Sequence, residues 1–359
     1  MRATERLRAS GQSLWLDNIT RGLLRSGQLQ RYVDEDAITG LTSNPSIFDH
    51  AFRTTDDYDD AIREGVAAGR TGEELFFDLA VEDLRAAADV FRPIHDATDG
   101  VDGWVSLEVS PLLAYDTERT IAEAAELHAR ADRPNLFIKI PGTEQGLPAI
   151  EEAIARGIPV NVTLLFSPQH YRAAADAYLR GVERRQAEGS DPAVGSVASV
   201  FMSRWDVAVH DRVPVGLQDR LALAVGLQTY RAYREVLDSE RFQRLANVGA
   251  RAQRLLWAST STKDPAASDT LYVHGLGAPL TVNTMPDETL RAFADHGEVG
   301  PPMPADGGDA EETLAAFAEA GVDVDALAAQ LQTDGAASFV SAWKDLLGVV
   351  DAKAGAVAG

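Results

Sequence analysis

The chain has 359 residues, enough to bury a large core, and no cysteine, so disulfides, thiolate catalysis and cysteine-ligated metals are excluded. Its 55 acidic and 33 basic residues give a formal net charge of −22. A surface of that charge repels nucleic-acid phosphates and anionic lipid, so neither nucleic acid nor a membrane is an expected partner.

Strand-like segments recur along the chain, and stretches with helical periodicity such as TERTIAEAAELHARA (residues 117–131) separate them. Alternating strands and helices favour a parallel sheet, and eight repeats favour a closed barrel. An open doubly wound sheet is the alternative, but no glycine-rich dinucleotide fingerprint follows any of the strands. The predicted strands span residues 13–16, 37–41, 104–109, 136–140, 159–164, 195–201, 254–259 and 270–275.

We therefore predict an α/β protein, a single (β/α)8 TIM-type barrel with helical insertions and C-terminal helices. The catalytic barrel is expected over residues 1–300, with a helical insertion at 206–250. The segment GEVGPPMPADGGDAEE, rich in proline, glycine and acid, then leads to two or three further helices. Residues 301–359 are thus predicted to be a linker and C-terminal helices packed on the barrel.

Lysine is scarce in this chain, and one lysine stands inside a predicted strand, NLFIKIPGT (residues 135–143). Lysine is almost never fully buried without a partner, because its ammonium loses too much hydration. Arginine supplies most of the positive charge, so Lys139 and Lys263 are predicted to do something that arginine cannot, such as forming a Schiff base. The four lysines are Lys139, Lys263, Lys344 and Lys353.

Barrel enzymes carry their catalytic groups at the C-terminal ends of the strands. Those positions hold an amine, two carboxylates, several amides and hydroxyls, and two further cations. The set suits Schiff-base aldol chemistry, in which an amine condenses with a ketone and the iminium accepts the electrons of the breaking C–C bond. The strand-end residues are Asp17; Thr42, Ser43, Asn44, Pro45 and Ser46; Glu108; Lys139; Asn161 and Thr163; Ser199, Phe201 and Arg204; and residues 259–263.

Simpler structural explanations exist for several of these residues. Lys139 could form a buried ion pair with Glu108 that has structural value only. Arg204 could pair with Asp206 on the surface, and Lys263 could belong to an exposed turn. Two of the strand-end residues could also cap helices, namely Asp17 and Asn44.

Two segments, GLTSNPSIF (residues 40–48) and LFIKIPGTEQGLPA (residues 136–149), together resemble the signature segments of the transaldolase family. The order Asp, TSNPS, Glu, Lys, Asn-x-Thr, Ser-x-Phe, Arg also resembles that family from residue 13 to about 206. The resemblance implies transfer of a dihydroxyacetone unit from sedoheptulose 7-phosphate or fructose 6-phosphate to glyceraldehyde 3-phosphate or erythrose 4-phosphate. It places the reaction in the non-oxidative pentose phosphate pathway and implies no metal or organic cofactor.

The resemblance also implies catalytic roles, position by position. Lys139 matches the Schiff-base lysine, and Asp17 matches the acid/base at the C4 hydroxyl of the substrate. Glu108 and Thr163 match the pair that positions a catalytic water. No histidine stands in a metal-ligand spacing such as HExxH, so no metal site is expected.

The substrate-binding roles follow in the same way, with one departure. Thr42, Asn44 and Asn161 match groups around the dihydroxyacetone unit. Many family members have a segment like ASFRN in the seventh strand, whereas this chain has ASTSTKDP, so Ser261 or Lys263 is expected to bind phosphate. The longer branch of the family, which this chain resembles, uses the lysine form. The segment that positions phosphate and substrate is matched by Ser199, Phe201 and Arg204.

Two other functions remain open at this point. A Schiff-base aldolase that releases free dihydroxyacetone would use the same residues, and a non-catalytic barrel could bind sugar phosphates. The expected partners are sugar phosphate substrates, and the expected assembly is a monomer or homodimer. The first residues, MRATERLRASGQ, lack the apolar core of a signal peptide, so we expect a cytoplasmic protein.

Overall fold

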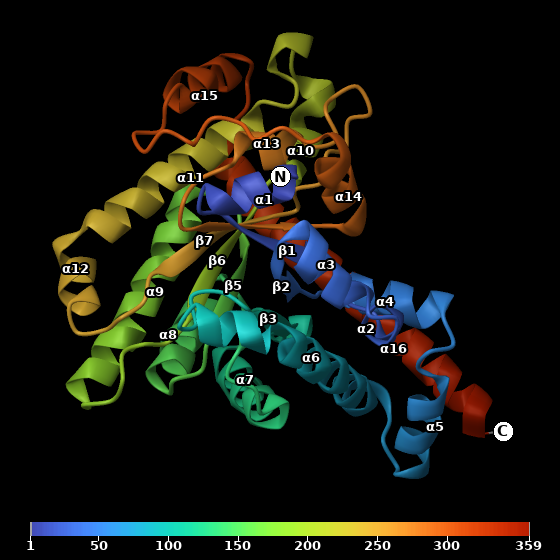
Figure 1. The fold of residues 1–359 in the computed structure, drawn as a ribbon. Coiled ribbons are helices and arrows are strands. Elements are labelled where there is room, and N and C mark those ends of the chain that lie inside the picture. Colours follow the sequence, from blue (N-terminus) through green and yellow to red (C-terminus); the bar gives the residue numbers. More distant parts are fainter. Residues whose placement is uncertain (1, 359) are drawn as a thin grey trace.

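The computed structural model describes residues 2–358, with a closed barrel of eight parallel strands at the centre (Figure 1). Each strand pairs in parallel with the next along the chain, and the eighth pairs with the first. The predicted α/β class and eight-stranded barrel are thus confirmed. The strands are β1 (Ser13–Asp17), β2 (Ile38–Thr42), β3 (Val105–Glu108), β4 (Leu136–Pro141), β5 (Val160–Leu165), β6 (Ser196–Phe201), β7 (Gln253–Ala258) and β8 (Thr281–Met285).

The eighth strand lies later in the chain than the sequence indicates, so the prediction of a strand at 270–275 is wrong. Those residues contain the short helix α13 (Leu271–Gly275), although TLYVHG is rich in β-formers. The true strand, TVNTM, is less obvious because it carries polar residues. One of them, Thr284, is buried, and its Oγ1 lies 2.7 Å from Thr42 Oγ1 of β2, which satisfies its hydroxyl.

Helices follow the strands and cover the outside of the barrel (Figure 1). Local capping explains several of their starts. Asn44 Oδ1 accepts a hydrogen bond from Ile47 N (3.2 Å), and Pro45 occupies the first helical position of the helix after β2. α1 (Ala3–Ala9) precedes β1. The helices that follow strands include α2 (Arg21–Arg25), α3 (Gln28–Asp36), α4 (Pro45–Thr54), α5 (Asp59–Ala67), α6 (Gly72–Ala97), α7 (Thr117–Ala131), α8 (Gly146–Ala155), α9 (Pro168–Ala187) and α14 (Asp287–His296).

Aromatic rings fill the N-terminal end of the barrel. The ring of Phe137 stacks on Trp104 with centroids 4.0 Å apart, and Trp15 lies 6.1 Å from the same phenylalanine. The indole of Trp15 donates to Asp102 Oδ1 (2.8 Å), so its polar atom is paired as well. Most of the predicted site residues lie at the other end of the barrel, where the strands finish.

The insertion between β6 and β7 contains α10 (Ser203–Val209), α11 (Leu221–Asp238) and α12 (Glu240–Ala246). Asp206 of α10 is buried and connects these parts. Its Oδ1 accepts hydrogen bonds from Leu221 N (2.9 Å) and Ala222 N (3.2 Å), and its Oδ2 accepts from the Tyr272 hydroxyl (2.7 Å). Asp206 thus caps α11, and the ion pair with Arg204 that the sequence left open is not formed. Burial raises the pKa of Asp206 to about 6.

We expect Asp206→Ala to lower the free energy of unfolding by about 1–3 kcal/mol, because two helix N–H groups and a buried hydroxyl lose their acceptor. Chemical denaturation followed by circular dichroism measures the change. Asp211→Ala, on the exposed turn after α10, is the matched control and should shift stability by less than about 0.5 kcal/mol. Equal effects of the two substitutions would contradict the capping role.

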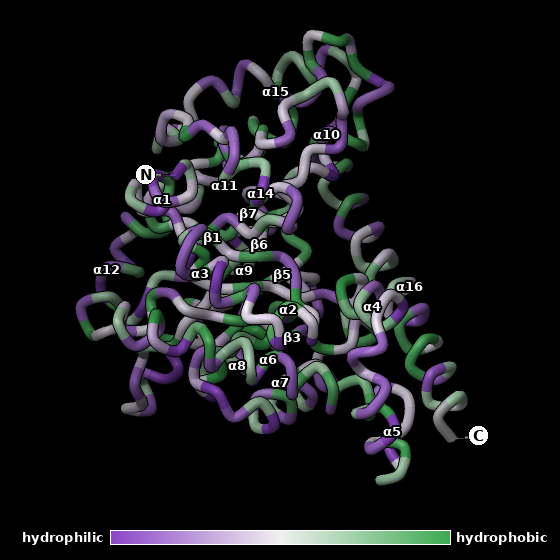
Figure 2. The backbone as a smooth tube through the Cα atoms, turned by 45° about the vertical axis from the view of Figure 1, so that its right-hand side comes forward, coloured by the Kyte–Doolittle hydropathy of each residue, from purple (hydrophilic) through white to green (hydrophobic). Residues whose placement is uncertain are grey.

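Two helices follow the linker after α14, α15 (Ala310–Glu319) and α16 (Val324–Ala358). α15 packs on α11, whereas α16 lies beside α4 and reaches α5 (Figures 1 and 2). Trp343 of α16 packs against α6, with ring centroids 4.9 Å from Phe76 and 5.6 Å from Phe77. The division into a barrel over 1–300 and a C-terminal segment over 301–359 stays a prediction.

Although α16 is 35 residues long, no helix in the described part of the chain combines the length and the apolar composition needed to cross a membrane. The hydropathy pattern of Figure 2 agrees with this, because hydrophilic and hydrophobic residues alternate along α16. Its apolar side packs on α4, α5 and α6.

Candidate active site

A cavity of about 390 Å³ opens where the strands end. Strand-end side chains form most of its wall, and α4 and α16 complete it. Two further predicted residues, Glu108 and Asn161, are buried and make hydrogen bonds to wall residues. The predicted site residues that line the cavity themselves are Asp17, Thr42, Asn44, Lys139, Thr163, Ser199, Phe201 and Arg204.

Parallel register brings three polar residues to one level of the barrel. Lys139 of β4 pairs with Glu108 of β3 on one side and with Asn161 of β5 on the other. Lys139 Nζ donates to Glu108 Oε2 (3.0 Å) and to Ser43 O (3.1 Å), and the two charged side chains are 6% and 4% exposed. The ion pair suggested by the sequence is therefore formed. It borders the cavity, because Lys139 also lines the wall.

Two carboxyl groups flank this amine, the buried Glu108 and the half-buried Asp17. Thr42 Oγ1 donates to Asp17 Oδ1 (2.7 Å). Burial raises the pKa of Asp17, and the positive charge of Lys139 and the Thr42 hydrogen bond oppose that rise. Burial likewise raises the pKa of Glu108, again opposed by Lys139. Carboxyl groups with raised pKa values can accept and return protons during a reaction near neutral pH.

A hydrogen-bond network fixes the amide of Asn161. Its Nδ2 donates to Ser106 Oγ (3.0 Å), and its Oδ1 accepts from Ser199 Oγ (2.7 Å). Within residues 2–358, two other buried atoms at this level have no protein partner, Glu108 Oε1 and Thr163 Oγ1. Buried polar atoms without a protein partner are candidates for contact with a ligand or a bound water.

Arg204 brings a partly buried positive charge to the wall. Its Cζ lies 5.3 Å from the centre of the Phe201 ring and 6.0 Å from that of Phe339. Burial lowers the pKa of Arg204. Among the described residues it forms no ion pair, unlike Lys139, so its charge is available to an anion. A guanidinium in this position can bind a phosphate through two parallel hydrogen bonds.

The structure does not bring Lys263 to the cavity. Its side chain is exposed, and its Nζ donates to Ser261 Oγ (3.0 Å). It lines a separate space of about 280 Å³ that also borders Asp264 and Tyr272. Its location agrees with the exposed turn that the sequence left open. The assignment of Lys263, or Ser261, to phosphate binding stays a prediction.

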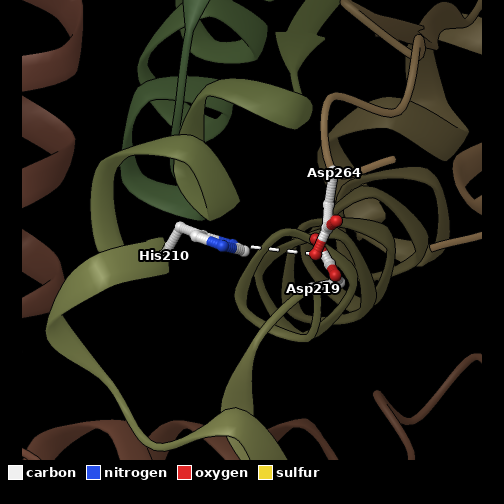
Figure 3. A group of neighbouring side chains, drawn as sticks. All are labelled: His210, Asp219 and Asp264. Atoms are coloured by element: carbon white, nitrogen blue, oxygen red, sulfur yellow. Dashed lines mark ion pairs between the residues drawn. The ribbon is translucent and has the colours of Figure 1, made fainter. Parts of the chain in front are cut away.

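Beside Lys263, three side chains have the donor types of a metal site (Figure 3). Ligand atoms of His210, Asp219 and Asp264 all lie within 4.8 Å of one another, and His210 Nδ1 is 3.8 Å from Asp264 Oδ2. Burial and the neighbouring Asp264 carboxyl raise the pKa of Asp219. A proton held between the two carboxyls relieves their repulsion as a cation would, and Lys263 borders the same space. These three residues line the same separate space as Lys263, not the cavity that opens at the strand ends.

The wall also contains residues that the sequence did not assign to the site, among them Thr284, Pro286 and Phe339. Thr284 and Pro286 are missed because the sequence places the eighth strand too early. Phe339 comes from α16, where an aromatic residue four positions before Trp343 indicates only an apolar helix face. The remaining wall residues are Asn18, Ser46, Ile47, His50, Ala258 and Ser259.

Comparison with known proteins agrees with the motifs and with the geometry of the cavity. The model of the Transaldolase/Fructose-6-phosphate aldolase family matches residues 14–350. The chain is 45% identical to a protein named transaldolase from Saccharopolyspora erythraea, with 96% of each chain covered. It is 47% identical to Transaldolase 1 of Streptomyces avermitilis, covering 96% of this chain and 94% of that protein. It is also 47% identical to a transaldolase of Thermobifida fusca, with 96% of each covered. The chain therefore belongs to the transaldolase/fructose-6-phosphate aldolase family.

Proposed function

We propose that this chain is a transaldolase in which Lys139 carries a dihydroxyacetone unit from a ketose phosphate to an aldose phosphate. The observation that carries the proposal is the Lys139 amine on the cavity wall, 3.0 Å from the Glu108 carboxylate. The donors would be sedoheptulose 7-phosphate or fructose 6-phosphate, and the acceptors glyceraldehyde 3-phosphate or erythrose 4-phosphate. Relatives named transaldolase support this assignment, and with it a place in the pentose phosphate pathway. A cytoplasmic location is part of the proposal and rests on the sequence alone.

Formation of the Schiff base requires a neutral amine and removal of a water molecule. In the proposed step Lys139 Nζ attacks the C2 carbonyl of the donor after giving a proton to Glu108. The carbinolamine then loses its hydroxyl as water, and the C=N bond forms. Glu108 Oε1 and Thr163 Oγ1 are the buried atoms free to hold that water. Asn161, held by Ser106 and Ser199, would bind a substrate hydroxyl through the second hydrogen of its amide.

The second carboxylate, Asp17, acts in C–C bond cleavage and in transfer. Asp17 takes the proton of the C4 hydroxyl, the C3–C4 bond breaks, and its electron pair moves into the iminium to give an enamine. The shortened aldose phosphate leaves, and the acceptor aldehyde enters. The enamine carbon then attacks that aldehyde, and Asp17 returns its proton to the new hydroxyl. The raised pKa of Asp17 suits a group that takes up and gives back a proton in each turnover.

Arg204 is the first candidate for phosphate binding, because it lines the cavity and forms no ion pair among the described residues. We expect Arg204→Ala to raise KM for phosphorylated donors by about 10- to 100-fold, the loss of one charge-assisted contact. KM for unphosphorylated donors should change far less. Steady-state kinetics with fructose 6-phosphate and fructose measure the difference.

Lys263→Ala is the matched variant for this measurement. If the 259–266 loop stays as the structure shows it, removing Lys263 changes KM by less than about 3-fold, because its ammonium is exposed and outside the cavity. A large, phosphate-specific rise in KM would instead bring Lys263 into the site, as the sequence motif implies. A rise for fructose as well as fructose 6-phosphate in Arg204→Ala would argue against phosphate recognition by Arg204.

The test of the function is borohydride trapping with fructose 6-phosphate, followed by peptide mapping. A reduced adduct on the Lys139 peptide is the expected result. Product analysis with and without erythrose 4-phosphate then separates transfer from the alternative, an aldolase that releases free dihydroxyacetone. A folded protein that forms no adduct would favour a non-catalytic barrel that binds sugar phosphates.

A further inference from the structure

Helix α16 is fixed against the strand ends at the cavity mouth. Gln332 Nε2 donates to Gly142 O (3.1 Å), directly after β4, and to Leu164 O (2.9 Å), near the end of β5. At Gly335, one turn further on, an added Cβ would lie 3.0 Å from Leu164 Cδ2 and 3.2 Å from Arg204 Nη1. The helix thus approaches the mouth closely, and its side chains there have little freedom to move away.

Phe339, on the next turn of α16, forms part of the cavity wall. The centre of its ring lies 5.5 Å from Lys139 Nζ and 6.3 Å from the ring of Phe201, and Arg204 Cζ lies 6.0 Å from it. The side chain is well buried, with Phe339 only 7% exposed. Its ring therefore faces both the proposed Schiff-base amine and the proposed phosphate ligand, and it presents an apolar surface to whatever is bound to Lys139.

Other contacts hold α16 in this position along its length. Trp343 is 1% exposed and packs against Phe76 and Phe77 of α6. Lys353 forms an ion pair with Asp59 of α5. Because these contacts lie outside the cavity, they keep the helix in place without touching the proposed substrate. Phe339 is the α16 residue that lines the cavity wall.

We propose that Phe339 covers the dihydroxyacetone unit on Lys139 and keeps water from its enamine, so that the enamine waits for an acceptor aldose. The proposal rests on the Schiff-base function given above. Phe339 is a specificity-determining residue in this account, since it decides what the enamine reacts with. The ring also lies within cation–π distance of Lys139 Nζ, a contact that can stabilise the positive charge of the iminium formed before C–C cleavage.

The competing reaction is hydrolysis of the enamine, and it needs only water. If water or a hydrated acid reaches the enamine, the C3 carbon takes a proton and the iminium of dihydroxyacetone forms. Water then adds to C2, a proton moves from the added water to the nitrogen, and the C–N bond breaks. Dihydroxyacetone leaves, and the free Lys139 amine is restored. The net result is cleavage of fructose 6-phosphate to dihydroxyacetone and glyceraldehyde 3-phosphate. An apolar ring over the site slows that protonation by excluding water.

The experiment compares Phe339→Ala and Phe339→Leu with the unmodified chain. For each protein, dihydroxyacetone release from fructose 6-phosphate alone is measured against transfer to erythrose 4-phosphate, and the borohydride adduct is quantified. We expect the ratio of release to transfer to rise about 10-fold or more in Phe339→Ala, with the adduct still formed. Phe339→Leu keeps an apolar side chain and should show a smaller rise. Lys344→Ala, on the exposed side of α16 and outside the cavity wall, is the control and should leave the ratio unchanged.

The outcomes separate this proposal from the function on which it rests. Absence of an adduct in the unmodified chain would refute the Schiff-base function itself. A normal adduct with an unchanged ratio in both Phe339 variants would overturn the shielding role alone. Loss of the adduct in a folded Phe339→Ala would also overturn it, because the ring would then be needed to form the imine. If Phe339→Ala does not fold, the ratio in Phe339→Leu decides.

Discussion

Lys139→Met is expected to abolish the borohydride-trapped adduct and to lower kcat by at least about 10⁴-fold, since the nucleophile is lost while an unbranched side chain of similar length remains. Glu108 then loses the cation that opposes the rise of its pKa, so the pKa rises further and the neutral acid is favoured at this buried position. The fold should therefore survive, which circular dichroism can verify.

Lys344→Met is the matched control for this experiment. Lys344 lies on an exposed face of α16, so the same substitution there should leave both kcat and adduct formation unchanged. Normal turnover by Lys139→Met would leave the Lys139–Glu108 ion pair with a structural role only. In that case the hypothesis of a barrel that binds sugar phosphates without catalysis would become the leading one.

Asp17→Asn is expected to form the imine but to cleave the C–C bond about 10²- to 10⁴-fold more slowly, the usual contribution of a positioned acid/base. The asparagine carbonyl can still accept the Thr42 hydrogen bond, so the position of the side chain is kept. Single-turnover experiments with fructose 6-phosphate separate the two steps, because the trapped adduct reports imine formation and glyceraldehyde 3-phosphate reports cleavage.

A control for charge alone is Asp99→Asn, because the Asp99 side chain is 99% exposed. Both steps should proceed normally in that variant. If Asp17→Asn instead slowed imine formation and cleavage to the same extent, and also lowered stability, Asp17 would be assigned a folding role.

Much of the candidate site can be predicted from the sequence, because its residues lie on strands that apolar runs make recognisable. Lys139 and Glu108 stand near the ends of apolar runs, and parallel pairing then places them side by side, with Asn161 of β5 on the other side of Lys139. The apolar pattern marks seven of the eight strands. It fails for β8 because a barrel interior tolerates polar residues whose hydroxyls are paired, as Thr284 is with Thr42.

The sequence could not indicate where Lys263 and Phe339 lie, because one is on a loop and the other on a helix far along the chain. The loop that carries Lys263 follows a strand end, but its path directs the side chain into a different space from the one lined by Arg204. Phe339 reaches the mouth because α16 packs across α4 and the ends of β4 and β5. Neither placement has a local sequence signal, since both depend on tertiary packing between segments far apart in the chain.

The span of the cavity wall along the chain has a consequence for synthesis. The wall begins at Asp17 and ends at Phe339, so almost the whole polypeptide must be made before it is complete. During translation, folding proceeds from the N-terminus as residues are added. A nascent chain that already contains all eight strands would hold Lys139 without Phe339 beside it. If the proposed roles of both residues hold, we expect this intermediate to release dihydroxyacetone from sugar phosphates, and transfer to begin once α16 has docked.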